Sequence, residues 1–158
     1  MPHLNNGDTF PILMLDTAGD GTISVTRHLS GQYGVVLIYR GSWCPYCNAQ
    51  LSAFARAKDR LDELGIRVVA LSVDAKADAI ALVEKHRLNF PVGYGVDAEK
   101  IAVSTGAYVN DSPRYLQSTG FVLDPTGNVI NAVYSSGAIG RLVAEDVIGF
   151  VRYVKSKT

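Results

Sequence analysis

Cysteine, tryptophan and surplus charge are all scarce in this sequence. Its 158 residues include two cysteines and one tryptophan, and 15 basic residues are balanced by 15 acidic ones. Because the chain has neither an excess nor a stripe of basic residues, it has no obvious means of holding the phosphates of a nucleic acid. We therefore expect no nucleic-acid partner.

Long hydrophobic runs are also missing. The longest apolar runs, such as Val35–Tyr39, are far too short to span a bilayer, so no membrane association is expected. Residues 1–8 contain neither a basic region nor an apolar segment, unlike a secretory signal. A cytoplasmic location is the default expectation. Because thiols stay reduced in that compartment, the two cysteines point to reactivity rather than to a structural disulfide.

The remaining composition is typical of a globular domain. Hydrophobic residues make up 47% of the chain and charged residues 19%. The length is sufficient for one hydrophobic core and short for two. Since the sequence contains no internal repeat, low-complexity tract or linker, we expect residues 1–158 to form a single domain.

The first half of the chain alternates between strand and helix patterns. Val35–Tyr39 is a continuous apolar run rich in β-branched residues, which predicts a strand buried on both faces. Gly65 stands where a helix should end, and Asp74 where the next should be capped. The predicted elements are a hairpin of Ile12–Leu15 and Ile23–Val25, the strand Val35–Tyr39, a helix from the cysteines to Gly65, a strand at Ile66–Val73 and a helix from Asp74 to about His86. This alternation indicates parallel pairing and an α/β fold.

The second half of the chain has a different pattern. Pro91 breaks the preceding helical pattern, and Asp124–Asn128 is a turn signal between two apolar stretches. The predicted elements are a short helix at Val96–Ser104, a loop at Tyr108–Ser118, strands at Phe121–Leu123 and Val129–Tyr134, and a closing helix whose apolar face carries Val143, Val147, Val151 and Val154. A strand–turn–strand unit and a helix therefore follow the parallel part.

Cys44 and Cys47 form the pattern that carries chemistry. A thiol is a useful nucleophile only as a thiolate, and a helix N-terminus favours that charge through its unpaired N–H groups and its dipole. The pair follows a predicted buried strand and opens an amphipathic helix, and Pro45 suits the first helical turn. The two-residue gap lets the second sulfur reach the first and close a small disulfide ring. The sequence therefore predicts a redox-active dithiol that needs no cofactor.

Three other interpretations of the cysteine pair exist. One is half of a structural zinc site, whose remaining ligands would have to come from His3, His28 and His86, far apart in the sequence. A second is c-type haem attachment, which requires His directly after the second cysteine, where this chain has Asn48. The third is a pair of inert core cysteines, which the neighbouring glycine, tryptophan and proline disfavour.

Residues Tyr39–Cys47 resemble the active-site segment of the thioredoxin superfamily. The tryptophan before the first cysteine follows the thioredoxin pattern, and the four residues from Cys44 to Cys47 also match the glutaredoxin tetrapeptide. Other segments look like peroxiredoxin-like members of the alkyl hydroperoxide reductase/thiol-specific antioxidant family: Leu71–Asp74, Phe90–Pro91 and Phe121–Gly127. The resemblance covers roughly residues 5–155. It implies a thioredoxin-like fold, in which helices flank a central mixed sheet with an N-terminal β-hairpin extension, and a thiol-based redox activity.

The resemblance to peroxiredoxins is broken close to the cysteines. Peroxiredoxins usually place Thr or Ser three residues before the peroxidatic cysteine, and Pro four residues earlier still. Those positions hold Gly41 and Leu37 if Cys44 is peroxidatic, and Cys44 and Arg40 if Cys47 is. Neither alignment keeps the pattern, so the motif favours a dithiol reaction slightly.

Other signature residues of both families are replaced as well. Peroxiredoxins carry an Arg just ahead of the strand near Phe121, where this chain has Ser118–Gly120. Arg114, in the preceding loop, is a candidate for the missing cation. Thioredoxins carry a buried acid in the strand before the motif and a cis-proline facing the cysteines, but Val35–Tyr39 has no acid, and Ser118 or Thr119 stands near the proline position. The chain is therefore a hybrid of the two patterns.

Residues around the motif are candidate supporting groups. Arg40 either steadies a thiolate or bound peroxide through charge-assisted hydrogen bonds or is a surface arginine at a strand end. Trp43 either covers the cysteine on a docking surface or packs against a neighbour, and Tyr46 should be exposed. If the fold analogy holds, Thr119 lies opposite the cysteines and offers its backbone to an extended substrate. Gln50, one helical turn beyond the motif, is expected to be a solvated polar residue.

Three functions are compatible with this sequence. The first is a thiol–disulfide redox enzyme in antioxidant defence: Cys44 attacks disulfide substrates, Cys47 resolves, and an external thiol reductant of thioredoxin or glutaredoxin/glutathione type completes the cycle. The alternative, favoured by the whole-chain resemblance, is a thiol-dependent peroxidase of peroxiredoxin type that reduces hydrogen peroxide or alkyl hydroperoxides through a sulfenic acid. The third is a non-enzymatic redox-sensing domain.

Overall fold

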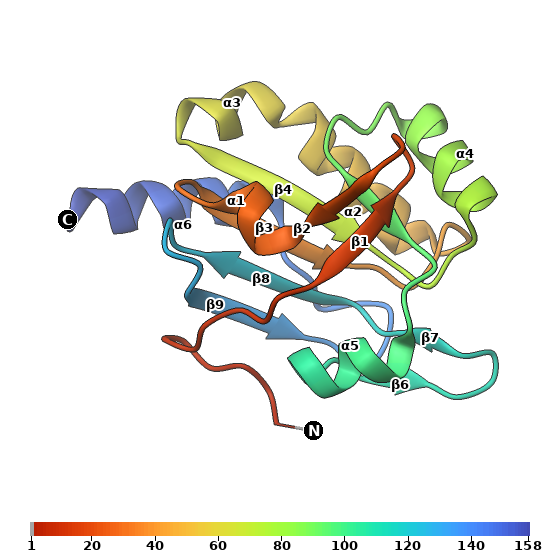
Figure 1. Cartoon of the computed structure of the whole chain (residues 1–158). Helices are drawn as coiled ribbons and strands as arrows, with labels where there is room; N and C mark the ends of the chain where they lie inside the picture. Colours follow the sequence, from red (N-terminus) through yellow and green to blue (C-terminus); the bar gives the residue numbers. More distant parts are fainter. Residues whose placement is uncertain (1) are drawn as a thin grey trace.

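The computed structural model describes residues 2–158 and shows a layered α/β arrangement (Figure 1). The strands are β1 (Met14–Thr17), β2 (Thr22–Ser24), β3 (Tyr33–Ile38), β4 (Ile66–Leu71), β5 (Val92–Tyr94), β6 (Val109–Asn110), β7 (Tyr115–Leu116), β8 (Thr119–Leu123) and β9 (Val129–Tyr134). The helices are α1 (Val25–Leu29), α2 (Pro45–Arg56), α3 (Lys58–Glu63), α4 (Lys76–His86), α5 (Ala98–Thr105) and α6 (Ala144–Ser156). The fold confirms the predicted mixed sheet flanked by helices.

The main sheet has seven strands in the order β2-β1-β5-β4-β3-β8-β9. Strand β3 runs parallel to β4 and antiparallel to β8, so it lies inside the sheet with a neighbour on each side. The predicted N-terminal hairpin is confirmed: β1 and β2 pair antiparallel, and β1 also pairs with β5. The hairpin therefore extends the sheet from its parallel edge.

Successive side chains of β3 point into two different cores, as the pleat of a strand requires. Val35 and Leu37 belong to the core beneath helices α2, α3, α4 and α6. Val36 and Ile38 belong to the core beneath α1 and α5. All four side chains have no exposed surface, which confirms the predicted doubly buried strand. The segment that follows β3 is thus fixed by packing on both faces of the sheet.

Some predicted boundaries differ from the structure. The helix expected to run from the cysteines to Gly65 is divided at Ala57 into α2 and α3. Asp74 does not cap α4, because Ala75 occupies the N-cap position. The carboxylate of Asp74 instead accepts the N–H of Ser42 at 2.8 Å. Tertiary contacts of this kind are not visible in local sequence patterns.

Two short pairings lie in segments that the sequence did not assign to strands. The predicted loop at 108–118 contains the two-stranded sheet of β6 and β7. Strand β5 begins directly after the helix-breaking Pro91 and pairs with both β4 and β1. Within residues 2–158, no helix is both long and apolar enough to cross a bilayer.

Candidate active site

The two cysteines lie at the start of α2, which follows the carboxyl end of the central strand β3. Cys44 is the N-cap of α2, and its sulfur accepts the N–H of Cys47 at 3.3 Å. Pro45 occupies the first helical turn, as predicted, where its missing N–H costs nothing. Both cysteines are free thiols and are completely buried. The strand–turn–helix context expected for a reactive thiol is therefore present.

The surroundings of Cys44 favour its thiolate. Burial alone would raise the pKa of Cys44, but hydrogen bonds from the thiol and N–H of Cys47 and from Arg40 outweigh burial. The charge of Arg141 adds to them, and the pKa of Cys44 is lowered from its ordinary value. The Nη1 atom of Arg40 lies 3.5 Å from the Cys44 sulfur. Cys44 is thus the better nucleophile of the pair.

The surroundings of Cys47 have the opposite net effect. Burial raises the pKa of Cys47, and the hydrogen bond that its thiol donates to Cys44 raises it further. Two donors act against this rise: the backbone N–H of Arg40, 3.3 Å from the Cys47 sulfur, and the Nη2 atom of Arg141, 3.4 Å away. The structure therefore holds one thiol whose pKa is lowered beside a second thiol that stays protonated to higher pH.

Arg40 is held in place by residues from the short β6–β7 region. Its Nε atom donates to the side-chain oxygen of Gln117 at 2.9 Å, and its Nη2 atom donates to the hydroxyl of Tyr115 at 3.0 Å. The guanidinium also lies 4.9 Å from the ring centre of Trp43 and 5.2 Å from that of Tyr115. Of the two roles weighed for Arg40, the geometry favours contact with the thiolate over that of a free surface arginine.

The two aromatic residues of the motif are partly exposed beside the buried cysteines. Trp43 and Tyr46 are both about half exposed, at 54% and 53%. The Trp43 ring packs edge-on against Tyr115, with 4.9 Å between ring centres. Gly41 makes this position possible, because a Cβ atom there would overlap the Trp43 indole. Trp43 thus both packs and presents a surface, while Tyr46 is exposed as expected.

Arg141 and Gln50 form a cluster that sequence reasoning missed. Gln50 is buried, not solvated as predicted: its amide nitrogen donates to the carbonyl of Leu142 at 2.8 Å, and its oxygen accepts from Arg141 at 2.7 Å. Arg141 comes from the loop after β9, 94 residues beyond Cys47. Gln50 stands one helical turn after Cys47, and this spacing could have indicated that its side chain lies near the site. No local pattern in the sequence marked Arg141.

The loop that carries the cysteines is anchored from a neighbouring strand. Asp74 follows β4 and accepts the N–H of Ser42, and the side chain of Asn48 donates to the Ser42 carbonyl at 3.1 Å. Burial raises the pKa of Asp74, although the hydrogen bond from Ser42 opposes this effect. These contacts join the ends of β3 and β4, which lie side by side in the sheet.

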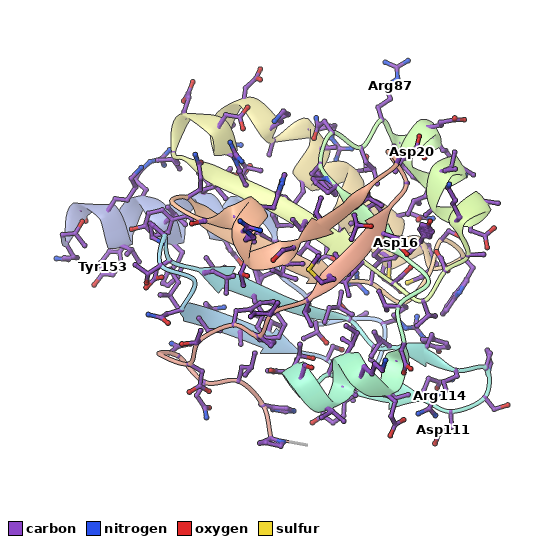
Figure 2. All side chains as sticks on the ribbon, viewed as in Figure 1. Asp16, Asp20, Arg87, Asp111, Arg114 and Tyr153 are labelled. Atoms are coloured by element: carbon purple, nitrogen blue, oxygen red, sulfur yellow. The ribbon has the colours of Figure 1, made fainter. Side chains whose placement is uncertain are left out.

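Two residues considered from the sequence lie elsewhere. Arg114 pairs with Glu99 and Asp111 on the surface, and Figure 2 shows Arg114 beside Asp111 at the edge of the molecule. It is not the cation at the cysteines. Thr119 is buried at the start of β8, where it pairs with Ile38 on one side and Tyr134 on the other. This arrangement leaves no open strand edge at Thr119 for an extended substrate.

Metal binding at the cysteines has no geometric support in residues 2–158. No three side chains among the histidines, cysteines and acids of this segment come together as a set that could hold an ion. His3, the ligand candidate nearest the N-terminus, stacks on Tyr134, with 3.8 Å between ring centres. The additional ligands that a structural zinc needs therefore do not accompany Cys44 and Cys47.

Comparison with known proteins places this architecture among peroxiredoxins. A peroxiredoxin of Treponema denticola is 28% identical over 160 residues, which cover 99% of this chain and 74% of that protein. The structure of Mycobacterium bovis AhpC matches with a TM-score of 0.83 at 20% identity, covering 100% of this chain and 96% of that one. A yeast mitochondrial 1-Cys peroxiredoxin, described as resolved via glutathione/thioredoxin systems, matches with a TM-score of 0.79 at 19% identity, over 97% of this chain and 77% of that one.

The family match rests on the sequence itself. Residues 6–132, well over half of the chain, match the AhpC/TSA family. This segment includes the hairpin, the central strand, both cysteines, β8 and the first part of β9. The thioredoxin-like fold and the resemblance first carried by Tyr39–Cys47 are confirmed by these matches. The chain therefore belongs to the AhpC/TSA family, as a thiol-dependent oxidoreductase of peroxiredoxin type.

Proposed function

We propose that this protein is a thiol-dependent peroxidase that reduces hydrogen peroxide or alkyl hydroperoxides, with Cys44 as the peroxidatic residue and Cys47 as the resolving residue. The relatives support the peroxidase alternative better than the disulfide exchange that the motif alone favoured. The observation that carries the proposal is the position of Cys44 at the N-terminus of α2, where its sulfur accepts the N–H of Cys47 at 3.3 Å and lies 3.5 Å from Nη1 of Arg40. These contacts lower the pKa of Cys44 despite its burial.

In the first step, the thiolate of Cys44 attacks one oxygen of the hydroperoxide. A sulfur–oxygen bond forms and the oxygen–oxygen bond breaks, leaving Cys44 as a sulfenic acid. The second oxygen departs with the electron pair and takes up a proton, giving water or an alcohol. Arg40, whose Nη1 atom lies 3.5 Å from the Cys44 sulfur, supplies positive charge and donors where negative charge moves from sulfur to oxygen.

In the second step, the sulfur of Cys47 attacks the sulfur of the Cys44 sulfenic acid. The new disulfide forms as the sulfur–oxygen bond breaks, and the hydroxyl leaves as water with the proton from Cys47. The two residues are already in contact, because the backbone N–H of Cys47 donates to the Cys44 sulfur at 3.3 Å. An external dithiol then reduces the disulfide, and a thioredoxin or glutaredoxin/glutathione system is the proposed source.

The altered signature of this chain is compatible with that reaction. Where peroxiredoxins usually carry Thr or Ser, this chain has Gly41, which makes room for the Trp43 indole. Where they carry an Arg before the strand near Phe121, this chain instead brings Arg40 to the sulfur from the end of β3. The cation is thus supplied from a different position in the sequence.

Disulfide exchange is the second candidate, supported by one feature of the surface. Trp43 and Tyr46 are exposed on either side of Cys44, where they could contact a partner protein. Such a partner would also need access to a sulfur atom. Because Cys44 has no exposed surface, this candidate requires the first turn of α2 to open.

Stopped-flow oxidation of the reduced protein tests these candidates. Trp43 is the only tryptophan, so intrinsic fluorescence follows the site directly. We expect a first phase whose rate rises in proportion to hydrogen peroxide, far faster than that of a free thiol, and a second phase independent of peroxide. Cys44→Ser should lose both phases, and Cys47→Ser should lose only the second.

Each alternative predicts another result. Slow reaction with peroxide but rapid reaction with a small disulfide would favour the exchange enzyme. Slow reaction with both would leave only the non-enzymatic sensing role. Retained peroxide turnover in Cys44→Ser would overturn the whole assignment.

A further inference from the structure

The Cys47 sulfur has its own cationic side chain, separate from the one at Cys44. The Nη2 atom of Arg141 lies 3.4 Å from the Cys47 sulfur. The same guanidinium donates to the carbonyl of Ala138 from Nε at 3.0 Å and from Nη2 at 2.7 Å. Within residues 2–158, Arg141 is the one cationic side chain that hydrogen-bonds to this sulfur. Of the two sulfur atoms, Arg141 therefore hydrogen-bonds to that of Cys47 alone.

Gln50 ties this guanidinium to the cysteine helix. Its side-chain oxygen accepts from Nη1 of Arg141 at 2.7 Å, while its nitrogen donates to the Leu142 carbonyl at 2.8 Å. Gln50 belongs to α2 and is buried one helical turn after Cys47. Both polar ends of one amide thus hold the loop after β9 against the helix that carries the thiol. The two hydrogen bonds together restrict where the guanidinium can lie.

The second step of the reaction needs a negative charge on the Cys47 sulfur, which burial and the neighbouring thiol disfavour. Cys47 must attack as a thiolate, yet burial and the hydrogen bond that it donates to Cys44 both raise its pKa. The other groups that face it are the backbone N–H of Arg40 and the phenol of Tyr39, whose own pKa is raised by burial. A neutral phenol brings no positive charge. Arg141 is left as the cation that can compensate the developing charge.

We propose that Arg141 acts in the resolving step, where its guanidinium holds the Cys47 thiolate as that sulfur attacks the sulfur of the Cys44 sulfenic acid. This role rests on the proposed peroxidase function and assigns the two arginines to successive steps, Arg40 to the first and Arg141 to the second. Gln50 is a positioning residue that acts through Arg141. The bond changes are those of the second step, and Arg141 neither gains nor loses a proton.

The first test does not depend on peroxide chemistry. In a Cys44→Ser background, the ultraviolet absorbance of the Cys47 thiolate is followed as the pH is raised. Adding Arg141→Gln should move the midpoint upward by about one pH unit, the size expected for loss of a nearby opposite charge. Arg141→Lys should recover part of the shift, and Gln50→Leu should give a smaller upward shift. An unchanged midpoint in Arg141→Gln would overturn the proposal.

The second test follows both phases of oxidation in the otherwise unaltered protein. Arg141→Gln should slow the peroxide-independent phase about tenfold near neutral pH, and the rate should recover as the pH is raised, since one pKa unit corresponds to a tenfold change in thiolate. The peroxide-dependent phase should fall by less than about twofold, because Arg141 is only a minor influence on Cys44.

The outcomes of the second test separate the two proposals. Equal slowing of both phases, or slowing that no rise in pH relieves, would assign Arg141 a merely structural role. Failure of the unaltered protein to react with peroxide would overturn the proposed function, while the titration would still decide whether Arg141 controls Cys47. Far-ultraviolet circular dichroism of Arg141→Gln and Arg141→Lys verifies that the variants fold.

Discussion

Arg40 and Arg141 each contact one sulfur atom, but they reach the site by different routes through the chain. Arg40 stands four residues before Cys44, and side chains from 115–117 hold it in place. Arg141 lies far beyond the motif, where a backbone carbonyl and one glutamine hold it. The pKa of Cys44 is lowered by the hydrogen bonds that outweigh its burial, whereas burial raises that of Cys47. Two thiols three positions apart are therefore made chemically different by segments from distant parts of the sequence.

The largest effect is expected from removing the guanidinium at Cys44. Arg40→Gln should slow the peroxide-dependent phase about 30-fold, the rate equivalent of ~2 kcal/mol for a hydrogen bond to a charged group. Arg114→Gln is the matched control, because Arg114 is a surface arginine that pairs with acids away from the sulfurs. Stopped-flow fluorescence measures both variants. Equal effects from the two substitutions would show that Arg40 acts only through the overall charge of the protein.

The pH dependence of the first phase sharpens the contrast between the thiols. Because the pKa of Cys44 is lowered, the rate should reach its plateau below the pH at which a free cysteine ionises, and it should be lost as the pH falls through that pKa. Arg40→Gln should move the midpoint upward by about one pH unit. Rate constants measured across the pH range determine both midpoints. A midpoint at or above that of a free thiol would contradict the assignment of Cys44 as the peroxidatic residue.

A smaller effect is expected from loosening the support of Arg40. Tyr115→Phe removes the hydroxyl that accepts from Arg40 at 3.0 Å but keeps the ring that packs on Trp43. The peroxide-dependent phase should slow about fivefold, as expected for ~1 kcal/mol of a neutral hydrogen bond. Tyr153→Phe is the control, because Tyr153 is exposed toward the far end of α6 (Figure 2). Full activity in Tyr115→Phe would show that Gln117 alone is sufficient to position the guanidinium.

The mildest change is expected from a substitution at the glycine beside the motif, which alters the surroundings of Trp43. Gly41→Ala places a methyl group where the Trp43 indole lies, and the half-exposed indole can move outward. Intrinsic fluorescence of the reduced protein should change, while the free energy of unfolding changes by about 1 kcal/mol or less. Gly149→Ala in α6 is the control, since its added methyl group meets nothing within 4 Å and leaves Trp43 untouched. An unchanged spectrum in Gly41→Ala would mean that Trp43 does not occupy this position in solution.

Most of the fold could be predicted from the sequence because it depends on local patterns. The unbroken apolar run at Val35–Tyr39 corresponds to a strand packed on both faces. The hairpin at residues 14–24 and the turn between β8 and β9 also follow from local turn signals. Strand β5 was missed because three residues after a proline carry too little periodicity. The division of the long helix at Ala57 was likewise not marked by any breaking residue.

The site could be predicted only where it is contiguous in the sequence. Cys44 and Cys47 were visible as a motif, and Arg40 was visible because it adjoins that motif. The prediction for Gln50 was wrong because its partners come from a loop more than ninety residues away. Arg141 itself lies among small residues in that loop, with no spacing that connects it to the cysteines. Long-range contacts of this kind are fixed by tertiary packing and not by local pattern.

The complete burial of both sulfur atoms gives the site a means of sorting its reactants by size. In the proposed reaction, a hydroperoxide of a few atoms needs only fluctuations of individual side chains to reach the sulfur. A protein disulfide can react only when the first turn of α2 separates from its surroundings. The free energy of that opening sets the fraction of molecules that are open, and the rate of reaction falls in proportion to this fraction. The reduced enzyme would thereby be kinetically insulated from the bulk pool of protein disulfides while remaining accessible to small oxidants.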